Sequence, residues 1–127
     1  MTKKILLIEP DKILADIYQN ALSSTGLNVE KAYNAQQGII LADNENPDLV
    51  ICELQLVDHS GVEFLYEFRS YVDWLKIPII IFSIVPPYEF SSCQIGLKRE
   101  LGVESYLYKP QTNLHRLLEV VGATLNS

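Results

Sequence analysis

The sequence lacks any apolar run long enough to cross a lipid bilayer. A membrane-spanning helix needs about 20 consecutive apolar residues, and no stretch of the 127-residue chain approaches that length. The amino terminus also lacks the order of basic, apolar and small residues that marks a secretory signal. These absences favour a cytoplasmic protein that does not act on a membrane.

Positive charge, cysteine and histidine are scarce as well. Ten Lys and Arg residues against sixteen Asp and Glu residues give a net charge of -6, and an acidic surface repels the phosphates of nucleic acid. Cys52, Cys93, His59 and His115 lack the close pairing that a metal centre of Cys and His requires. We therefore expect no direct nucleic-acid binding and no such metal centre, with each cysteine a small apolar core residue.

What the sequence does contain is enough apolar material for one folded domain. Apolar residues make up 48% of the chain, and a domain of this size buries about two thirds of the surface that its unfolded chain exposes. No linker, internal repeat or low-complexity tract divides the sequence. The prediction is a single domain over residues 1–127, with no output domain.

Short apolar runs alternate with helical patterns along the whole chain. Strands are expected at residues 4–8, 27–33, 47–53, 77–83 and 105–108. Helices are expected at residues 13–22, 34–42, 61–75, 90–102 and 114–125, with Gly26 as a left-handed cap after the first. Parallel strands need crossover connections, so this alternation predicts one parallel sheet covered on both faces.

Polar side chains follow four of these strands, and the most informative is Glu53, which ends the buried run after Pro47. The carboxyl ends of parallel strands share one edge, where open α/β sheets place their ligands. Glu9 and Asp11, Glu53, Ser83 and Lys109 would meet there. Carboxylates can accept a phosphoryl group or hold a divalent cation, and a hydroxyl and a lysine can contact the transferred oxygens. The set predicts a site that handles phosphoryl groups.

Four motifs in this order give the chain a specific resemblance. They are Ile8-Glu9-Pro10-Asp11, Pro47-Asp48-Leu49-Val50-Ile51-Cys52-Glu53 with Gly61 eight residues later, Pro78-Ile79-Ile80-Ile81-Phe82-Ser83, and Tyr106-Leu107-Tyr108-Lys109-Pro110. With them, the chain resembles a receiver domain of the bacterial response-regulator family over essentially its whole length. The resemblance implies a flavodoxin-like, doubly wound five-stranded parallel sheet of order 2-1-3-4-5 with five helices, and a role in phosphorelay signalling.

The resemblance also implies roles for the site residues. In the family, an Asp at the Glu53 position is phosphorylated by a histidine kinase, and an acidic pair after the first strand holds magnesium. A Thr or Ser at the Ser83 position follows the phosphoryl group, and the aromatic residue matching Tyr106 changes orientation. The lysine matching Lys109 pairs with phosphate beside a Lys-Pro bond that is usually cis.

Expected partners, also by resemblance, are proteins. A histidine kinase, a phosphotransfer protein or an output protein would bind the domain, either as a single-domain regulator or as a piece of a longer chain. A homodimer could form through the fourth helix, fifth strand and fifth helix, roughly residues 88–125.

Several pocket residues depart from the family pattern. Glu53 is one methylene longer than Asp, and a displacement of that size can cost a large factor in rate. Pro10 replaces the second acid of the magnesium pair, and Ile84 stands where a small residue is expected. Val57 and Ser60 replace the Pro and Asp usual in the loop.

These departures lead to the hypothesis of a pseudo-receiver, which keeps the fold and binds proteins but is not switched by conventional aspartyl phosphorylation. Glu53 would pair with Lys109 and hold one conformation. The alternative is a conventional, magnesium-dependent response regulator that accepts phosphate on Glu53 or Asp58. Magnesium would bind only if the altered pocket keeps enough ligands, and no other cofactor and no enzymatic activity are expected.

Structural roles remain open for each of these residues. Glu9 and Asp11 also suit the start of a helix, where the helix dipole favours negative charge. Ser83 could be a satisfied hydroxyl at a strand end, Tyr106 a packing residue, and Lys109 a structural partner of an acid.

Two other function classes fit less well. A phosphatase with an Asp nucleophile needs a second acid where Gln55 stands, and a nucleotide or flavin binder needs a glycine-rich loop after the first strand. Surplus apolar residues on helix faces indicate either a partner interface or ordinary scattered exposure. They are Tyr66, Trp74, Tyr88 and Ile95.

Overall fold

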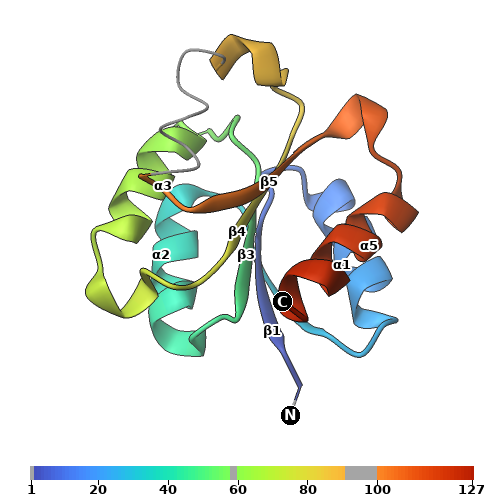
Figure 1. Cartoon of the computed structure of the whole chain (residues 1–127), viewed down its shortest axis with the longest axis horizontal. Helices are drawn as coiled ribbons and strands as arrows, with labels where there is room; N and C mark the ends of the chain where they lie inside the picture. The colour runs from blue at the N-terminus through green and yellow to red at the C-terminus, as the bar shows by residue number, and fades with distance from the viewer. Residues whose placement is uncertain (1, 58–59, 91–99) are drawn as a thin grey trace.

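A five-stranded parallel sheet forms the centre of the molecule (Figure 1). The structure is a computed structural model, and it describes residues 2–57, 60–90 and 100–127. The strands are β1 (Lys4–Ile8), β2 (Asn28–Ala32), β3 (Leu49–Cys52), β4 (Ile79–Ser83) and β5 (Val103–Tyr108). Their order across the sheet is β2-β1-β3-β4-β5. The predicted fold class and strand order are confirmed.

Helices cover both faces of this sheet. Helices α1 (Lys12–Ser23) and α5 (Leu114–Leu125) lie on one face, and α2 (Ala35–Glu45) and α3 (Gly61–Arg69) lie on the other (Figure 1). Short 3-10 turns are η1 (Val72–Trp74), η2 (Pro87–Phe90) and η3 (Lys109–Gln111). The described part of the chain thus has four α-helices. The fourth predicted helix, residues 90–102, falls mostly on residues 91–99, outside the described residues.

Alternate strand residues point to opposite faces, so the sheet divides the core into two buried clusters. The cluster under α2 and α3 includes Leu6, Ile8, Val50, Cys52, Ile81, Phe64 and Phe68. The cluster under α1 and α5 includes Ile5, Leu7, Ile51, Ile80, Phe82, Tyr18 and Leu117. Burial on both faces explains why the strands have continuous apolar sequences.

Helix α2 begins with a reciprocal pair of capping side chains. The Asn34 side chain accepts a hydrogen bond from the Gln37 N–H at 2.8 Å, and the Gln37 side chain accepts one from the Tyr33 N–H at 2.9 Å. Gly38 is a weak helix former, but close packing explains why a glycine stands at this position. A Cβ there would lie 2.8 Å from the Cδ1 of Ile8, so glycine lets α2 approach the sheet closely.

Helix α3 is shorter than predicted. The sequence predicted one helix over residues 61–75, but α3 ends at Arg69 and the chain turns into η1. The turn brings Trp74 under the helix, where its ring stacks on Phe68 with centroids 4.8 Å apart and is only 5% exposed. The Arg69 guanidinium fixes the turn by donating to the Trp74 carbonyl oxygen at 2.6 Å. The prediction of Trp74 as a surplus surface residue is therefore wrong.

The apolar residues expected on the buried faces of two helices lie partly in solvent. On α1, Ile13 is 74% and Ile17 is 43% exposed, and the buried side consists of Ala15, Tyr18 and Leu22. Beyond α3, Tyr71, Val72 and Leu75 are exposed because the helix ends before them.

The left-handed conformation predicted for Gly26 after the first helix is confirmed, since its φ is 92°.

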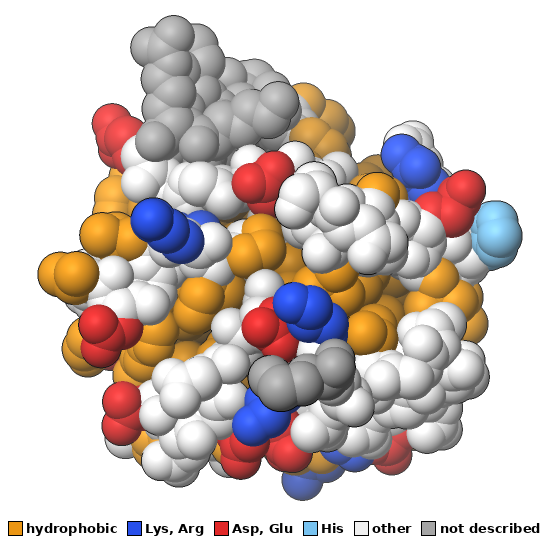
Figure 2. Space-filling model, turned by 60° about the horizontal axis from the view of Figure 1, so that its bottom comes forward, with side chains coloured by type: hydrophobic (Ala, Val, Ile, Leu, Met, Phe, Trp, Pro, Cys, Tyr) orange, Lys and Arg blue, Asp and Glu red, His pale blue; other side chains and the backbone are white. Residues whose placement is uncertain are grey.

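Charged side chains are scattered over the surface. Figure 2 shows Lys and Arg side chains separated by acidic and apolar ones on the face in view, without an extended basic area among the residues described there. Within residues 2–57, 60–90 and 100–127, no helix has both the length and the apolar content needed to cross a membrane.

Candidate functional site

Glu53 directly follows strand β3 and lies at the carboxyl edge of the sheet. The Glu53 N–H donates to the Ile8 carbonyl oxygen at 3.0 Å, so the acid directly follows the last pairing with β1. The loop after Glu53 then folds back, and the Gly61 N–H donates to the Leu54 carbonyl oxygen at 2.7 Å. A Cβ at Gly61 would lie 2.4 Å from the Cα of Leu54. Only glycine permits this approach, which fixes the backbone on either side of Glu53.

Four donors surround the Glu53 carboxylate. Lys109 Nζ at 2.8 Å and the Ile84 N–H at 3.1 Å donate to Oε1. The Ser83 hydroxyl and the Gln55 N–H, the latter at 3.1 Å, donate to Oε2. Glu53 is 2% exposed. Since a carboxylate offers about four lone-pair positions, this buried acid has its acceptor capacity filled by the protein itself.

Lys109 joins two buried carboxylates. Its ammonium donates to Glu53 and to Glu9, which is 3% exposed. The other Glu9 oxygen accepts a hydrogen bond from the Asp11 N–H at 3.0 Å. The ammonium also lies 5.7 Å from the ring centroid of Tyr18 and 5.6 Å from that of Phe82, within the range of cation–π attraction. The expected pairing of Lys109 with Glu53 is therefore present and is extended by Glu9.

These contacts keep both partners charged. Burial by itself would raise the pKa of Glu53, but the hydrogen bonds from Lys109, Ser83 and the Gln55 main chain outweigh it and hold the pKa below its ordinary value. Burial would lower the pKa of Lys109, yet the bonds to Glu53 and Glu9 raise it above its ordinary value. Glu53 and Lys109 thus form a buried ion pair at neutral pH, and the same ammonium also donates to Glu9.

The end of β4 is tied to the same acid. Ser83 is fully buried, and its oxygen accepts a hydrogen bond from the Val85 N–H at 3.0 Å while its hydroxyl donates to Glu53. The Tyr106 hydroxyl donates to the Val85 carbonyl oxygen at 2.6 Å. Ile84 contacts Glu53 through its main-chain N–H, and it is 48% exposed. Glu53, Ser83 and Tyr106 thereby form one connected hydrogen-bond network.

The side chain of the other predicted acid, Asp11, points away from Glu53 and Lys109. It is the N-cap of α1, and its side chain accepts hydrogen bonds from the Ile13 and Leu14 N–H groups at 2.9 and 3.0 Å. Of the two roles left open by the sequence, the structure gives Asp11 the helix-capping one. Pro10, between Glu9 and Asp11, has no oxygen in its side chain.

This arrangement does not fit a magnesium ion. Magnesium requires several oxygen ligands in octahedral geometry, but the oxygens of Glu9 and Glu53 already accept hydrogen bonds from Lys109 and main-chain donors. Asp11 faces α1 instead of the pocket. Among the described residues, no group of three or more His, Cys, Asp or Glu side chains could hold a metal ion.

The remaining predicted residues lie at or beyond the rim. Val57 is 87% exposed, and Ser60 is the N-cap of α3, accepting a hydrogen bond from the Glu63 N–H at 3.2 Å. Asp58, the alternative phosphoacceptor, and His59 lie outside the described residues. No peptide bond in the described segments is cis, so Lys109–Pro110 is trans. The resemblance implied a cis bond at this position, and that expectation is wrong. Lys109–Gln111 form the 3-10 turn η3 with a trans bond.

Cys52 lies in the core, as expected from the sequence, and His115 lies in solvent. Cys52 is fully buried beside Glu53, where burial raises the pKa of its thiol, and the thiol donates to the Glu53 carbonyl oxygen at 3.2 Å. His115 lies on the exposed face of α5, with its Nε2 3.9 Å from a Glu119 oxygen. Cys93 lies outside the described residues.

The sequence predicted the four polar side chains of the pocket but missed two of its donors. Glu9, Glu53, Ser83 and Lys109 come together as expected. The main-chain N–H groups of residues 55 and 84 were not predicted, because every residue type except proline offers one and no sequence signal marks it. Their position directly after strand ends was the available clue.

The fold and this pocket define a doubly wound α/β domain with its polar site at the carboxyl edge of the sheet. The family model described as Response regulator receiver domain matches residues 5–121. The chain therefore belongs to the response regulator receiver domain family, whose members are signalling modules of two-component systems.

Similar proteins agree with this family. The KDP operon transcriptional regulatory protein KdpE of Escherichia coli K12 is 31% identical over 106 residues, covering 84% of this chain and 44% of that protein. The Regulator of RpoS of the same strain is 28% identical over 123 residues, covering 97% of this chain and 35% of that protein. This chain thus spans less than half the length of both.

One similar solved structure is the CheY-like response regulator receiver domain protein from Methanospirillum hungatei JF-1. It superposes with a TM-score of 0.85 at 26% identity, covering 99% of this chain and 95% of that one.

Proposed function

We propose that this receiver domain is a pseudo-receiver, which signals by binding proteins and is not switched by conventional aspartyl phosphorylation. The observation that carries the proposal is the filled hydrogen-bond capacity of Glu53. An acid that attacks a phosphoryl group needs a free lone pair and space in front of it. Here Lys109, Ser83 and two main-chain N–H groups occupy both oxygens.

The charge balance of the pocket also supports the proposal. A phosphoryl group on Glu53 would place about -1.5 to -2 charges, in place of the single carboxylate charge, in a site where Lys109 already serves both Glu9 and Glu53. The arrangement of the described acids does not fit the divalent cation that would offset this charge. Phosphorylation of Glu53 would therefore require breaking the existing network before any new contact formed.

In the proposed state, Glu53 acts as an internal ligand of the signalling site. Its oxygens hold Ser83, the main chain after β4 and Lys109 in one arrangement, and Tyr106 is hydrogen-bonded to Val85 in the same network. The domain would present one constant surface to a protein partner. A histidine kinase, a phosphotransfer protein and an output protein are the partner classes that we propose for that surface.

Phosphorylation is tested directly by intact-mass measurement after incubation with acetyl phosphate and magnesium. The wild-type protein is expected to keep its unmodified mass. A stoichiometric adduct, mapped by peptide mass spectrometry to Glu53 or Asp58, would overturn the proposal and support the conventional alternative.

A matched variant shows whether the altered residues cause this behaviour. The double substitution Pro10→Asp and Glu53→Asp shortens the buried acid and restores an acidic pair beside it. It is expected to gain a phosphoryl adduct under the same conditions. Far-UV circular dichroism serves to confirm that the variant is folded, because its pocket charge differs from that of the wild type.

A further inference from the structure

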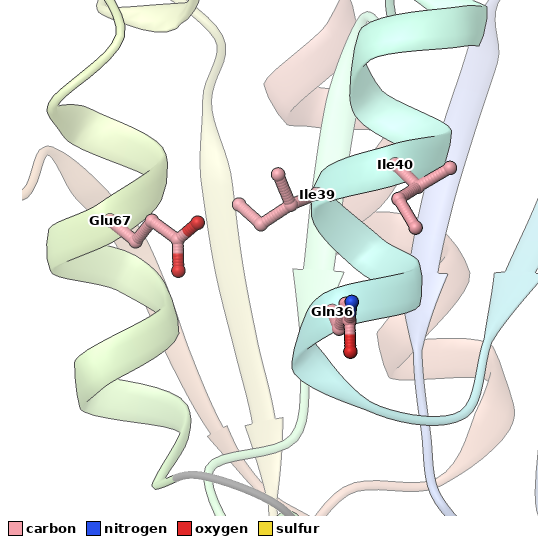
Figure 3. Close-up of a pocket in the computed structure, with 4 residues that line it drawn as sticks. All are labelled: Gln36, Ile39, Ile40 and Glu67. Atoms are coloured by element: carbon pink, nitrogen blue, oxygen red, sulfur yellow. The ribbon is translucent and has the colours of Figure 1, made fainter.

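A hollow lies between helices α2 and α3, and none of its lining residues contacts Glu53. It has a volume of about 390 Å³ and is lined by Gln36, Ile39, Ile40 and Glu67. Figure 3 shows Ile39 pointing from α2 towards α3 and Glu67 pointing from α3 towards α2. We call this feature the α2–α3 groove.

The wall of the groove on α2 contains two isoleucines beside Gln36. Ile40 is 51% exposed, and Ile39 packs partly against the core beneath it. Tyr66, next to Glu67 on α3, is 54% exposed. Single exposed apolar side chains are ordinary, but Ile39 and Ile40 line one hollow, where a partner side chain would lose contact with water.

The charged residues beside this groove are acidic. Glu67 lines it, and Asp43 lies one helical turn beyond Ile39 on α2. Neither acid forms an ion pair within the described segments of the chain. Helix α2 has no Lys or Arg, and the single one on α3, Arg69, is held by the main-chain oxygens of Trp74 and Leu101.

Charge complementarity identifies the kind of partner. We propose that the α2–α3 groove binds a basic amphipathic helix of another protein. An apolar side chain of that helix would contact Ile39 and Ile40, and Lys or Arg residues one turn away would pair with Glu67 and Asp43. The groove is lined by two isoleucines, a glutamine and a glutamate, a mixture that suits the side chains of an amphipathic helix.

This inference is independent of phosphorylation, since the groove shares no lining residue with the Glu53 pocket. An acidic or neutral helix would leave Glu67 and Asp43 without partners at a partly desolvated surface, which is unfavourable. The preference for positive charge is therefore the distinguishing property of the groove.

Binding is tested with the ¹⁵N-labelled 127-residue chain and a synthetic helical peptide of Leu and Lys, with Leu at positions i, i+3 and i+7. Chemical-shift changes are expected to concentrate on α2 and α3 around Ile39, Ile40 and Glu67. A matched peptide with Glu in place of Lys is expected to give none at the same concentration. A spin label on the basic peptide is expected to broaden the same resonances.

Two variants separate groove binding from general attraction to an acidic protein. Glu67→Lys and Ile40→Ser are each expected to weaken peptide binding about tenfold, as for a central interface residue. Glu119→Lys on α5 makes the same charge change on the opposite face of the sheet and is expected to alter binding less than about twofold. Equal weakening by Glu119→Lys, broadening centred on α1 or α5, or binding of the acidic peptide would overturn the proposal.

Discussion

Replacing Lys109 by Met removes the ammonium that the two buried acids of the pocket, Glu9 and Glu53, share. Methionine has nearly the length of lysine but no charge, so Glu9 and Glu53 lose their common partner and face each other as unneutralised carboxylates. Both are at most 3% exposed, so water cannot replace the lost ammonium. Lys109→Met is therefore expected to destabilise the fold strongly.

The size of the loss follows from the burial of these groups. Removing one partner of a buried ion pair costs about 3–5 kcal/mol, a large part of the roughly 5–15 kcal/mol that stabilises a domain. For a chain of this size the melting temperature should fall by roughly 10–20 °C. Part of the loss is expected to be regained in the Lys109→Met, Glu53→Gln double variant, because one of the two unpaired buried charges is gone.

Urea unfolding at pH 7, followed by circular dichroism, measures the change. Lys31→Met is the matched control, since Lys31 pairs at 2.5 Å with an Asp16 side chain that is 60% exposed, and exposed ion pairs contribute little. A Lys109→Met variant within about 1 kcal/mol of the wild type, or one no less stable than Lys31→Met, would refute the reasoning.

The pH dependence provides a second check. The pKa of Glu53 is lowered in the fold, so its stabilising contribution is present above its unfolded value of about 4.3 and is lost as pH falls through the folded value. In Lys109→Met the acid is buried without its cation, so protonation relieves the penalty. The difference in unfolding free energy between wild type and variant should therefore shrink as pH falls from 7 to 4.

Three further substitutions test local features by the same urea assay. Gly61→Ala should cost at least about 2 kcal/mol, because the new Cβ would lie 2.4 Å from the Cα of Leu54; unchanged stability would contradict the close approach. Asp11→Ala should cost about 1 kcal/mol through the lost helix cap, and a change near zero would argue against that role. Ser83→Ala should cost about 1–3 kcal/mol, because Glu53 loses one of its four donors; no loss would show that this bond contributes little.

The sheet was predictable because parallel strands are buried on both faces and therefore have continuous apolar sequences. The end of α3 was not, because apolar spacing continues past Arg69 and only tertiary packing reveals the turn. Trp74 is buried through its stacking on Phe68, and a single helical pattern cannot distinguish that arrangement from one more turn of helix. Ile13 and Ile17 show the same limit on α1, where the apolar stripe is wider than the surface that the sheet can cover.

The pocket was predictable to the extent that its side chains follow strand ends. Glu9, Glu53, Ser83 and Lys109 come together for that reason alone, whatever their chemistry. Whether Asp11 faced the pocket or the helix depended on one backbone turn at Pro10, and the sequence left both possibilities open.

The sharing of Lys109 by two acids also has an evolutionary consequence. Placing an acid at Pro10 while Glu53 is still full length would add another negative charge to a buried cluster with one cation. Shortening Glu53 first would break its hydrogen bonds with Ser83 and Lys109 and leave space for a metal ion. The two substitutions are thus expected to be strongly epistatic, and a pseudo-receiver of the proposed kind would acquire phosphoryl chemistry more readily by one order of steps than by the other.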